Sequence, residues 1–374
     1  MPSFTLVNQV TIPDTDARTW LYAIPDGDPT GTGLPLVLTV EAPSLTRAGV
    51  SAVYAVRADP FAASLSGLGW VELAPVGFHP RASVRDHAHI FNRGRHWVSR
   101  SFEDKGLSVC TFQPSLVDVT APPGSGFPLF GPTGFPGRAQ LNTGWSTNDH
   151  CMSPAGDGVW VSALDGTYSA QRFARVDANM RTRMSPRMVP RVGDPADPVW
   201  NTASARPIRG QPGARAHVVA PTSLHYNKTS DLRVLEADFS TGLWTDTQRI
   251  TWGSSNQLQM GTRVALPGGA VAITYKRLST SWRTATDQDD SGDIVRSLYD
   301  AAGTWLDNEV MVDSQGSSWT TSGNRPHTQL LRYRGDTYLL TSWDQWDLST
   351  SGGTRTTGNG SPSGCVLRVE QWVP

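Results

Sequence analysis

Four segments of the chain combine a tryptophan with small polar residues and then an acidic, basic or amide side chain. They read WSTNDH (145–150), WNTASARP (200–207), WGSSNQLQM (252–260) and WTTSGNRPH (319–327). Trp rings stack on the apolar faces of pyranose rings, while fixed polar groups hydrogen-bond the sugar hydroxyls. The segments therefore predict sugar recognition. The alternative is that recurring tryptophans fill the space between packed sheets.

The dipeptide Asp-His is a second repeated signal, and it occurs in RDHAH (85–89) and in NDHC (148–151). Arginine followed by proline also recurs, in ARPI (205–208) and NRPH (324–327). We expect these polar residues to open the innermost strands of a repeated structure. The alternative is that each histidine bonds a carboxylate or a backbone carbonyl and only holds those strands together.

The elements that would position these residues are short strands. Strand pairs around a tight glycine turn recur, for example HAHIFNRGRHWVSRSF (87–102) and HTQLLRYRGDTYLLTSW (327–343). A third strand follows each pair, and a more polar fourth segment follows in five units of six. The first strand of the chain, FTLVNQVTI (4–12), belongs to no other unit.

This pattern predicts an all-β fold, a six-bladed β-propeller of four-stranded antiparallel blades, closed by the N-terminal strand completing the last blade. The alternatives are five blades with an N-terminal β-extension, or a two-domain sandwich. We expect one domain over residues 1–374, with blades at 14–80, 81–140, 141–199, 200–251, 252–316 and 317–374 plus 3–13.

In such a ring, the connection from an outer strand to the next inner strand crosses one face of the disc. Two longer loops, predicted over 278–293 and 343–364, emerge on the same face and would form one wall of a cleft. The candidate ligand-binding residues on this face are Trp145, Asp149, Trp200, Trp252, Trp282, Trp319, Trp343, Trp346, Arg18, Arg85 and Asp86.

Two turns after third strands, ADFSTGLW (237–244) and YDAAGTW (299–305), resemble degenerate Asp-boxes, the turn found in sialidase-like propellers. The full box has Ser or Thr two residues before the Asp, and no unit of this chain meets it. The resemblance implies a propeller fold and glycans as a ligand class, and it implies no particular reaction.

The strand openings RDHAH, NDHC, ARPI and NRPH are also similar to those of propeller polysaccharide lyases and related glycoside-cleaving families. That resemblance implies that His87 or His150 abstracts the proton alpha to a uronate carboxylate, with His327 in the same set. Arg206 or Arg325 would neutralise the carboxylate.

A sialidase would need three arginines around a carboxylate and a Tyr–Glu nucleophile pair. Arg18, Arg206 and Arg325 could supply the arginines by position. However, no tyrosine in the sequence has a convincing glutamate partner, and glycosidases generally use two carboxylates.

Composition excludes several classes. Net charge −1 with 17% charged residues disfavours non-specific nucleic-acid binding, and no run of about 18 apolar residues predicts membrane insertion. The N-terminus lacks the pattern of a secretory signal peptide, and we expect an extracellular or virion-surface protein. The spacing of Cys110, Cys151 and Cys365 fits no disulfide framework or metal site.

We expect no cofactor. The segment DQDDSGD (287–293) offers Asp287, Asp289, Asp290 and Asp293 as candidate calcium ligands, but the twelve-residue calcium loop is absent. A solvated acidic loop tip is the other interpretation.

Three functions remain open on the sequence. The favoured one is a carbohydrate-binding propeller on a virion tail or cell surface, because the Trp-polar segments repeat. The second is an enzyme, either a polysaccharide lyase or a glycoside hydrolase, because the two unequal long loops suggest a single asymmetric site. The third is a structural propeller that contacts other subunits of a larger assembly.

Overall fold

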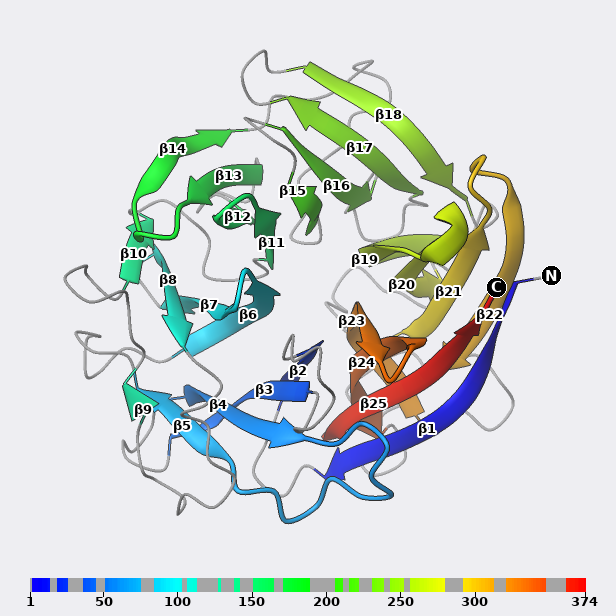
Figure 1. Ribbon diagram of the computed structural model, residues 1–374, viewed down its shortest axis with the longest axis horizontal. Coiled ribbons are helices and arrows are strands. Elements are labelled where there is room, and N and C mark those ends of the chain that lie inside the picture. Colours follow the sequence, from blue (N-terminus) through cyan, green and yellow to red (C-terminus); the bar gives the residue numbers. More distant parts are fainter. Residues whose placement is uncertain are drawn as a thin grey trace.

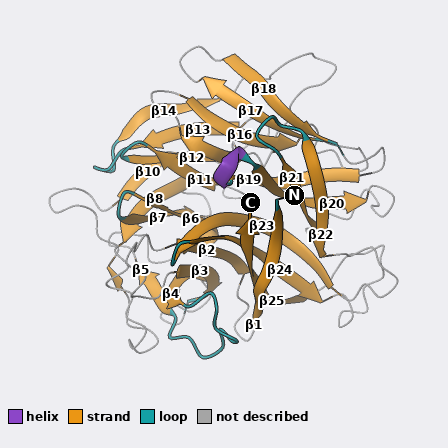
Figure 2. Ribbon diagram, turned by 45° about the vertical axis from the view of Figure 1, so that its right-hand side comes forward, coloured by secondary structure: helices purple, strands orange, loops and turns teal. Residues whose placement is uncertain are grey.

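The computed structural model describes residues 2–13, 19–25, 36–44, 51–74, 84–102, 106–112, 127–128, 138–141, 151–164, 171–188, 206–210, 215–221, 231–238, 243–251, 256–279, 292–312, 321–347 and 361–374. Within these residues nearly all regular structure is β-strand, and one short 3-10 helix, η2 (Pro267–Gly269), is present. Figure 2 shows this composition. The all-β prediction is confirmed.

The described strands form six sheets. The first three contain β2 (Thr19–Pro25), β3 (Leu36–Pro43), β4 (Ser51–Ala58), β5 (Val71–Ala74) and β9 (Phe127–Pro128); then β6 (Val84–Asn92), β7 (Arg95–Phe102), β8 (Gly106–Phe112) and β10 (Arg138–Leu141); then β11 (Cys151–Ala155), β12 (Gly158–Leu164), β13 (Gln171–Val176) and β14 (Thr182–Met188).

The other three contain β15 (Arg206–Gly210), β16 (Arg215–Pro221), β17 (Leu232–Asp238) and β18 (Leu243–Ile250); then β19 (Asn256–Ala265), β20 (Val271–Ser279), β21 (Asp293–Tyr299) and β22 (Trp305–Val312); then β23 (Thr321–Tyr333), β24 (Asp336–Asp347), β25 (Ser361–Val373) and β1 (Ser3–Pro13).

The sheets are arranged as in a β-propeller, around a common axis (Figure 1). Strands β2, β6, β11, β15, β19 and β23 lie nearest the axis, and each sheet continues outward from there. Six inner strands therefore face one another at the centre, which brings residues from distant parts of the sequence together.

The N-terminal strand β1 pairs antiparallel with β25, from Ser3 opposite Val373 to Pro13 opposite Gly364. The side chain of Asn8, at a β-bulge in β1, donates hydrogen bonds of 2.8 Å to the carbonyls of Pro60 and Ala62. These bonds connect the C-terminal sheet to the turn after β4 in the first sheet.

Two of the described hairpins have tight turns whose residues adopt positive φ. Arg93 and Gly94 (φ 48° and 76°) join β6 to β7, and Arg334 and Gly335 (φ 52° and 89°) join β23 to β24. Two successive positive φ values are typical of the hairpin turn whose twist matches the flanking strands. The glycine turns that the sequence predicts at 93–94 and 334–335 are thus hairpin turns in the structure.

Aspartates hold the turns after two third strands. Asp300 Oδ1 accepts hydrogen bonds from the backbone N–H of Ala302 (2.9 Å) and Thr304 (2.7 Å). Asp177 Oδ1 accepts equivalent bonds of 2.9 Å from Asn179 and Arg181. The other Asp-box-like segment, ADFSTGLW (237–244), begins at the end of β17, and its residues 239–242 lie outside the described part of the chain.

Apolar side chains between neighbouring sheets form the core. Leu21, Leu38 and Val40 of the first sheet pack with Leu340 and Leu367 of the C-terminal sheet. Similar clusters join the second sheet to the third and the fourth to the fifth. Alternation along each strand turns one set of residues toward each neighbour, so both faces of a sheet are buried.

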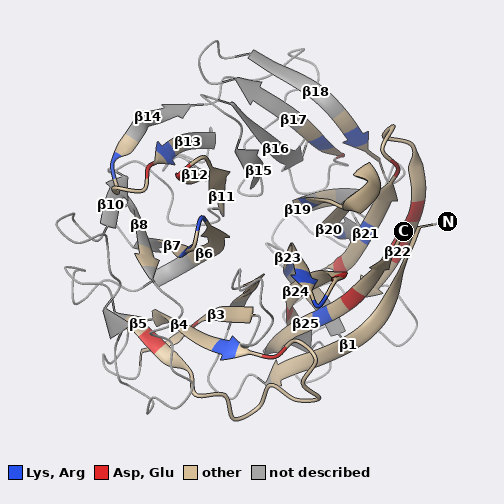
Figure 3. Ribbon diagram, viewed as in Figure 1, with Lys and Arg blue, Asp and Glu red and all other residues tan. Residues whose placement is uncertain are grey.

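A charged cluster joins the fifth and C-terminal sheets (Figure 3). Arg296 of β21 bonds Glu370 of β25 and Glu309 of β22, and Arg368 bonds the same two glutamates. The guanidinium carbon of Arg296 also lies 3.9 Å from the ring centroid of Phe4 in β1. The contact between these sheets is therefore both ionic and apolar.

Candidate functional site

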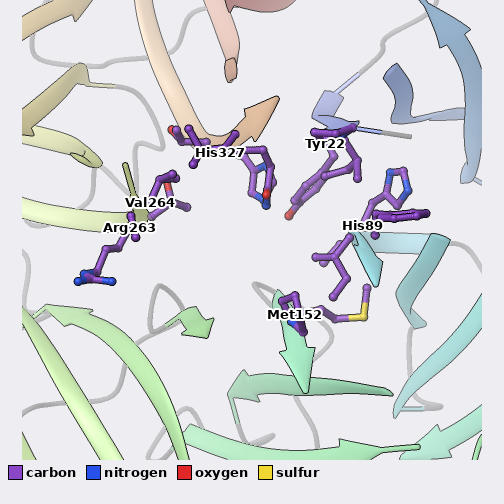
Figure 4. Close-up of a pocket in the computed structure, with 17 residues that line it drawn as sticks. Tyr22, His89, Met152, Arg263, Val264 and His327 are labelled. Carbon is purple, nitrogen blue, oxygen red and sulfur yellow. The ribbon is translucent and has the colours of Figure 1, made fainter. Parts of the chain in front are cut away.

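A cavity of about 350 Å³ lies at the axis. Five of the six inner strands contribute to it within the described residues. Its lining consists of residues 22, 24–25, 88–91, 152, 154, 262–265 and 327–330. Figure 4 shows labelled side chains from these strands around the cavity. Convergence of several inner strands makes this the natural candidate site.

A β-bulge precedes the lining run in three of these strands. The register shifts by one residue between Thr19 and Tyr22 in β2, between Gln259 and Thr262 in β19, and between Asn324 and His327 in β23. Bulges re-aim the side chains that follow them. The first lining residue in each case, Tyr22, Thr262 or His327, follows its bulge directly.

Aromatic and polar groups meet inside the cavity. The rings of Tyr22 and His327 lie with centroids 4.5 Å apart and are tilted by 59° (Figure 4). Gln329 Nε2 lies 3.4 Å from His327 Nε2. The described lining thus offers phenol, imidazole, amide and hydroxyl groups beside apolar side chains.

Three histidines continue away from Tyr22 in a buried hydrogen-bonded chain. His87 Nε2 lies 3.2 Å from Thr39 Oγ1, which lies 3.1 Å from His89 Nδ1, and His89 Nε2 lies 2.8 Å from His96 Nδ1. Burial, followed by the neighbouring His96, His87 and His327, holds the pKa of His89 well below its ordinary value. Neutral imidazoles can donate with one nitrogen and accept with the other, which suits such a chain.

The five candidate catalytic residues have different environments. His327 lines the cavity, whereas His87 is fully buried behind Tyr22, at 5.0 Å between ring centroids. Arg325 has φ 52° and pairs with Asp344 at 3.3 Å. Arg206 begins β15, with its side chain outside the described part, and His150 lies outside it altogether. The structure therefore brings His87 and His327 to the same region.

Most of the predicted ligand-binding residues lie outside the described part of the chain. They are Arg18, Trp145, Asp149, Trp200, Trp252, Trp282 and Trp319. For Arg85, Asp86 and Trp346 the structure describes only the backbone, in β6 and β24. Their role in binding stays a prediction.

The prediction that Trp343 lies in a long loop and lines a cleft is wrong. Trp343 lies within β24 and is 1% exposed. Its ring packs in a cluster with Ile294, Val312 and Val366, between the fifth and C-terminal sheets. A ring buried by protein on this scale has no face left for a sugar.

The predicted loop over residues 343–364 was wrong at both ends. Strand β24 continues to Asp347, and β25 begins at Ser361.

Asp293, one of the candidate calcium ligands, forms a buried ion pair with Arg277. Its Oδ2 accepts hydrogen bonds of 2.8 and 2.6 Å from Arg277. Among the described residues no group of three or more His, Cys, Asp or Glu side chains could hold a metal ion. Asp287, Asp289 and Asp290 lie outside those residues.

The sequence analysis did not identify Tyr22, Thr262 and Gln329, and it included His89 only as part of the segment RDHAH (85–89). The predicted site lay at the openings of the inner strands, whereas in β2, β6 and β19 the residues that line the cavity lie in the later half of the strand, as in β2, where they begin at Tyr22 and end at Pro25. The available signal was weak. A bulge adds one residue to a strand, and that addition is visible only once the partner strand fixes the register.

No helix within the described residues is long and apolar enough to cross a membrane.

No protein-family model matches the chain. A search of curated proteins also gives no match.

Solved structures share its architecture at low sequence identity. A subtype N11 neuraminidase-like protein of a flat-faced bat isolate from Peru (H18N11) matches with TM-score 0.50 and 12% identity, over 98% of this chain and 94% of that one. A subtype N10 neuraminidase-like protein of a little yellow-shouldered bat isolate from Guatemala matches with TM-score 0.47 and 10% identity, over 100% and 99%. A thermostable family-43 glycoside hydrolase matches with TM-score 0.45 and 8% identity, over 79% and 91%.

The fold is thus similar to that of the sialidase-like propellers, as the Asp-box-like turns indicated. At this identity the likeness concerns the fold alone.

Proposed function

We propose that the protein is a carbohydrate-binding propeller whose ligand occupies the axial cavity. The observation that carries the proposal is the lining itself, in which the rings of Tyr22 and His327 stand beside Gln329 and Thr262. Sugar rings need both an apolar surface and fixed hydrogen-bonding groups, and this cavity supplies both.

The proposal includes a complete ring. In this proposal the six sheets are six blades, and β1 closes the ring as the outer strand of the last blade. One departure from the expected four-stranded antiparallel blades is β9, which falls within the expected second blade but pairs in parallel with β5 of the first sheet. Closure matters for binding because the cavity wall is shared by β2 of the first blade and β23 of the last. A ring open at that point would not hold Tyr22 against His327.

In the proposed role the protein is displayed at a cell or virion surface, where polysaccharides are its partners. Its low charged fraction of 17% suits uncharged or weakly charged polymers. Association with other subunits of a larger assembly belongs to the same proposal. Gold-labelled antibodies on intact particles or cells would show whether the protein lies outside.

The test is retention on immobilised neutral and acidic polysaccharides, with the variants Gln329→Ala and His327→Ala. We expect both variants to lose at least about tenfold in affinity, since each removes a polar group from the cavity. Trp305→Ala is the matched control, because Trp305 is a 55% exposed aromatic residue of outer strand β22. Absence of retention by the unmodified protein on every polymer would refute the proposal.

A second candidate, a polysaccharide lyase, is favoured by the contact between His327 and Tyr22. In that reaction His327 would take the proton alpha to a uronate carboxylate, and the bond from the beta carbon to the glycosidic oxygen would break. The leaving oxygen would receive a proton from Tyr22, and a carbon–carbon double bond would form. New chain ends with ultraviolet absorbance, lost in His327→Ala, would establish the lyase in place of simple binding.

A further inference from the structure

We infer that one end of the axial cavity is an apolar site for an aromatic ring carried by the sugar. The inference rests on the proposed function, in which the sugar itself lies at the other end, beside Tyr22 and His327.

The lining of the cavity changes in character along the inner strands. Strands β6, β19 and β23 contribute runs of four residues, 88–91, 262–265 and 327–330, and β2 contributes residues 22, 24 and 25. Each sheet repeats the same strand order outward from the axis, so these strands run in the same direction and their runs start at the same face of the disc. The first residues of the runs are Tyr22, Ala88, Thr262 and His327, and the last are Pro25, Phe91, Ala265 and Leu330. Three of the first residues are polar, whereas all of the last are apolar.

The last residues, together with one residue of β11, form a set that we call the apolar end. Its members are Pro25, Phe91, Pro154, Ala265 and Leu330. All five are exposed or only half-buried, whereas Ile24 and Ile90, one position earlier in their strands, are 1% and 3% exposed. Apolar side chains that stay accessible in a cavity are typical of a ligand site, because a ligand that covers them removes apolar surface from water.

The charges of the lining lie elsewhere. Among the lining residues that the structure describes, Arg263 is the one that is always charged, and it comes two positions before the end of its run. Its side chain extends away from Tyr22 and His327 (Figure 4). No Asp or Glu belongs to the described lining. An apolar group at the apolar end would therefore displace no ion pair of the described lining.

The shape of the apolar end favours an aromatic ring over a flexible chain. Phe91 presents a ring, and Pro25 and Pro154 are rigid rings as well. The ring of Phe91 packs against His96 with centroids 5.0 Å apart, which holds it in place. Aromatic rings gain from tilted contacts with one another, and a rigid ring loses little conformational freedom on binding to a rigid wall.

The experiment compares pairs of glycosides by titration calorimetry. Each pair consists of the methyl and the p-nitrophenyl glycoside of one sugar, taken from glucose, galactose, mannose, xylose and glucuronic acid. The two members differ only in the aromatic ring. The dye 1-anilinonaphthalene-8-sulfonate, which fluoresces in apolar sites, tests the apolar end without a sugar.

Two variants change the apolar end. Ala265→Asp places a carboxylate at an exposed position of this end, and Leu330→Gln removes apolar surface from it. Leu6→Gln is the matched control, because Leu6 is 53% exposed in outer strand β1 and does not line the cavity.

We expect the p-nitrophenyl member of at least one pair to bind about tenfold more tightly than the methyl member, since burial of a ring removes apolar surface from water. Ala265→Asp should abolish that difference, Leu330→Gln should reduce it about threefold or more, and Leu6→Gln should leave it unchanged. Dye fluorescence should fall at least about twofold in Ala265→Asp and stay unchanged in Leu6→Gln.

Equal binding within every pair, or an undiminished aromatic preference in Ala265→Asp, overturns the inference while the proposed function stands. If neither glycosides nor polysaccharides bind, the proposed function fails and the dye tests the apolar end alone. Dye fluorescence that is the same in Ala265→Asp and the unmodified protein would then overturn the apolar site as well.

Discussion

At the scale of single residues, the chain from His87 through Thr39 and His89 to His96 fills a boundary between the first and second sheets with polar groups. Three of its members are histidines that are fully buried. Each hydrogen bond in the chain requires an imidazole nitrogen without a proton or a hydroxyl that accepts. Burial disfavours the charged form of His89, the central member of this group.

The pH dependence of stability follows from His89. Its pKa in the folded protein lies well below the ordinary value of 6.5, because burial disfavours the charged form and His96, His87 and His327 add to this. The unfolded chain consequently binds more protons as the pH falls below about 6.5, so this contribution to stability is complete above that pH and is lost below it. We expect the unfolding temperature to decrease between about pH 7 and pH 5.

Thermal unfolding at a series of pH values measures this effect. The variant His89→Leu cannot titrate at that position, and its unfolding temperature should depend less on pH over the same range. A parallel dependence in the variant and the unmodified protein would show that His89 does not cause it.

At the scale of elements, turns and bulges position the site. A tight turn fixes which residues of two strands are opposite, and a bulge changes that pairing by one residue. The bulges before Tyr22, Thr262 and His327 thereby direct three side chains to the axis from strands separated by much of the sequence. Elements of regular geometry alone would point other residues there.

The Asp turns give a prediction for local stability. Asp300→Ala removes the acceptor of two backbone N–H groups, and we expect a loss of about 1–2 kcal/mol in the free energy of unfolding. Asp177→Ala should cost at least as much, since its buried carboxylate also accepts two backbone N–H bonds. Urea denaturation of both variants measures the loss.

Asp157→Ala serves as the matched control for these turns. Its carboxylate is 53% exposed and lies 3.4 Å from Arg175. Exposed ion pairs contribute little, so this variant should stay within about 0.5 kcal/mol of the unmodified protein. If Asp300→Ala costs no more than Asp157→Ala, the turn bonds do not stabilise the fold.

Close backbone approach between sheets gives a second element-scale prediction. Gly292 and Gly323 exchange two backbone hydrogen bonds of 2.8 Å between the fifth and C-terminal sheets. A Cβ atom at Gly323 would overlap Cγ1 of Ile294 and lie 2.9 Å from its Cδ1. Gly323→Ala should therefore destabilise the protein by about 1–3 kcal/mol.

A double-mutant cycle with Ile294→Ala tests the cause in chemical denaturation. Ile294→Ala removes the atoms that the new Cβ atom of Gly323→Ala would meet. The double variant should therefore lose less free energy of unfolding than the two single variants lose together. Strict additivity would mean that the overlap with Ile294 is not the origin of the loss.

At the scale of the whole molecule, the fifth and C-terminal sheets are joined by the cluster of Arg296, Arg368, Glu309 and Glu370. Arg296 and Glu370 are 3% and 1% exposed, while Glu309 is 38% exposed. Loss of one partner from a buried pair leaves the other charge without compensation. The cluster should therefore be most sensitive at Glu370.

We expect Glu370→Gln to lower the free energy of unfolding by about 3 kcal/mol or more, and Glu309→Gln by less, because water reaches Glu309. Denaturant unfolding at low and at high salt compares the two variants. Equal losses would indicate that burial does not control the energy of this cluster. A large loss in free energy of unfolding for Glu370→Gln would also show that this cluster holds the C-terminal sheet to the fifth sheet.

The sequence by itself determined the all-β character and the tight turns at 93–94 and 334–335, but it gave neither the full extent of β24 nor the pairing of β9 with the first sheet. Turns such as Arg93–Gly94 and aspartates such as Asp300 interact with residues close to them in the sequence, so a short stretch of sequence is enough to predict them. The fold class followed from their regular spacing. The predicted presence of His327 near the axis followed in the same way, from its place at the opening of a repeated strand pair.

Only the tertiary structure decided which side chains meet. Trp343 has the composition of a binding loop around it, yet packing against Ile294 and Val366 buries it. Tyr22 and Thr262 gave no signal, yet bulges and neighbouring strands bring them to the cavity. The physical reason is that register and burial depend on partners far away in the sequence, whereas turn chemistry depends on residues close by.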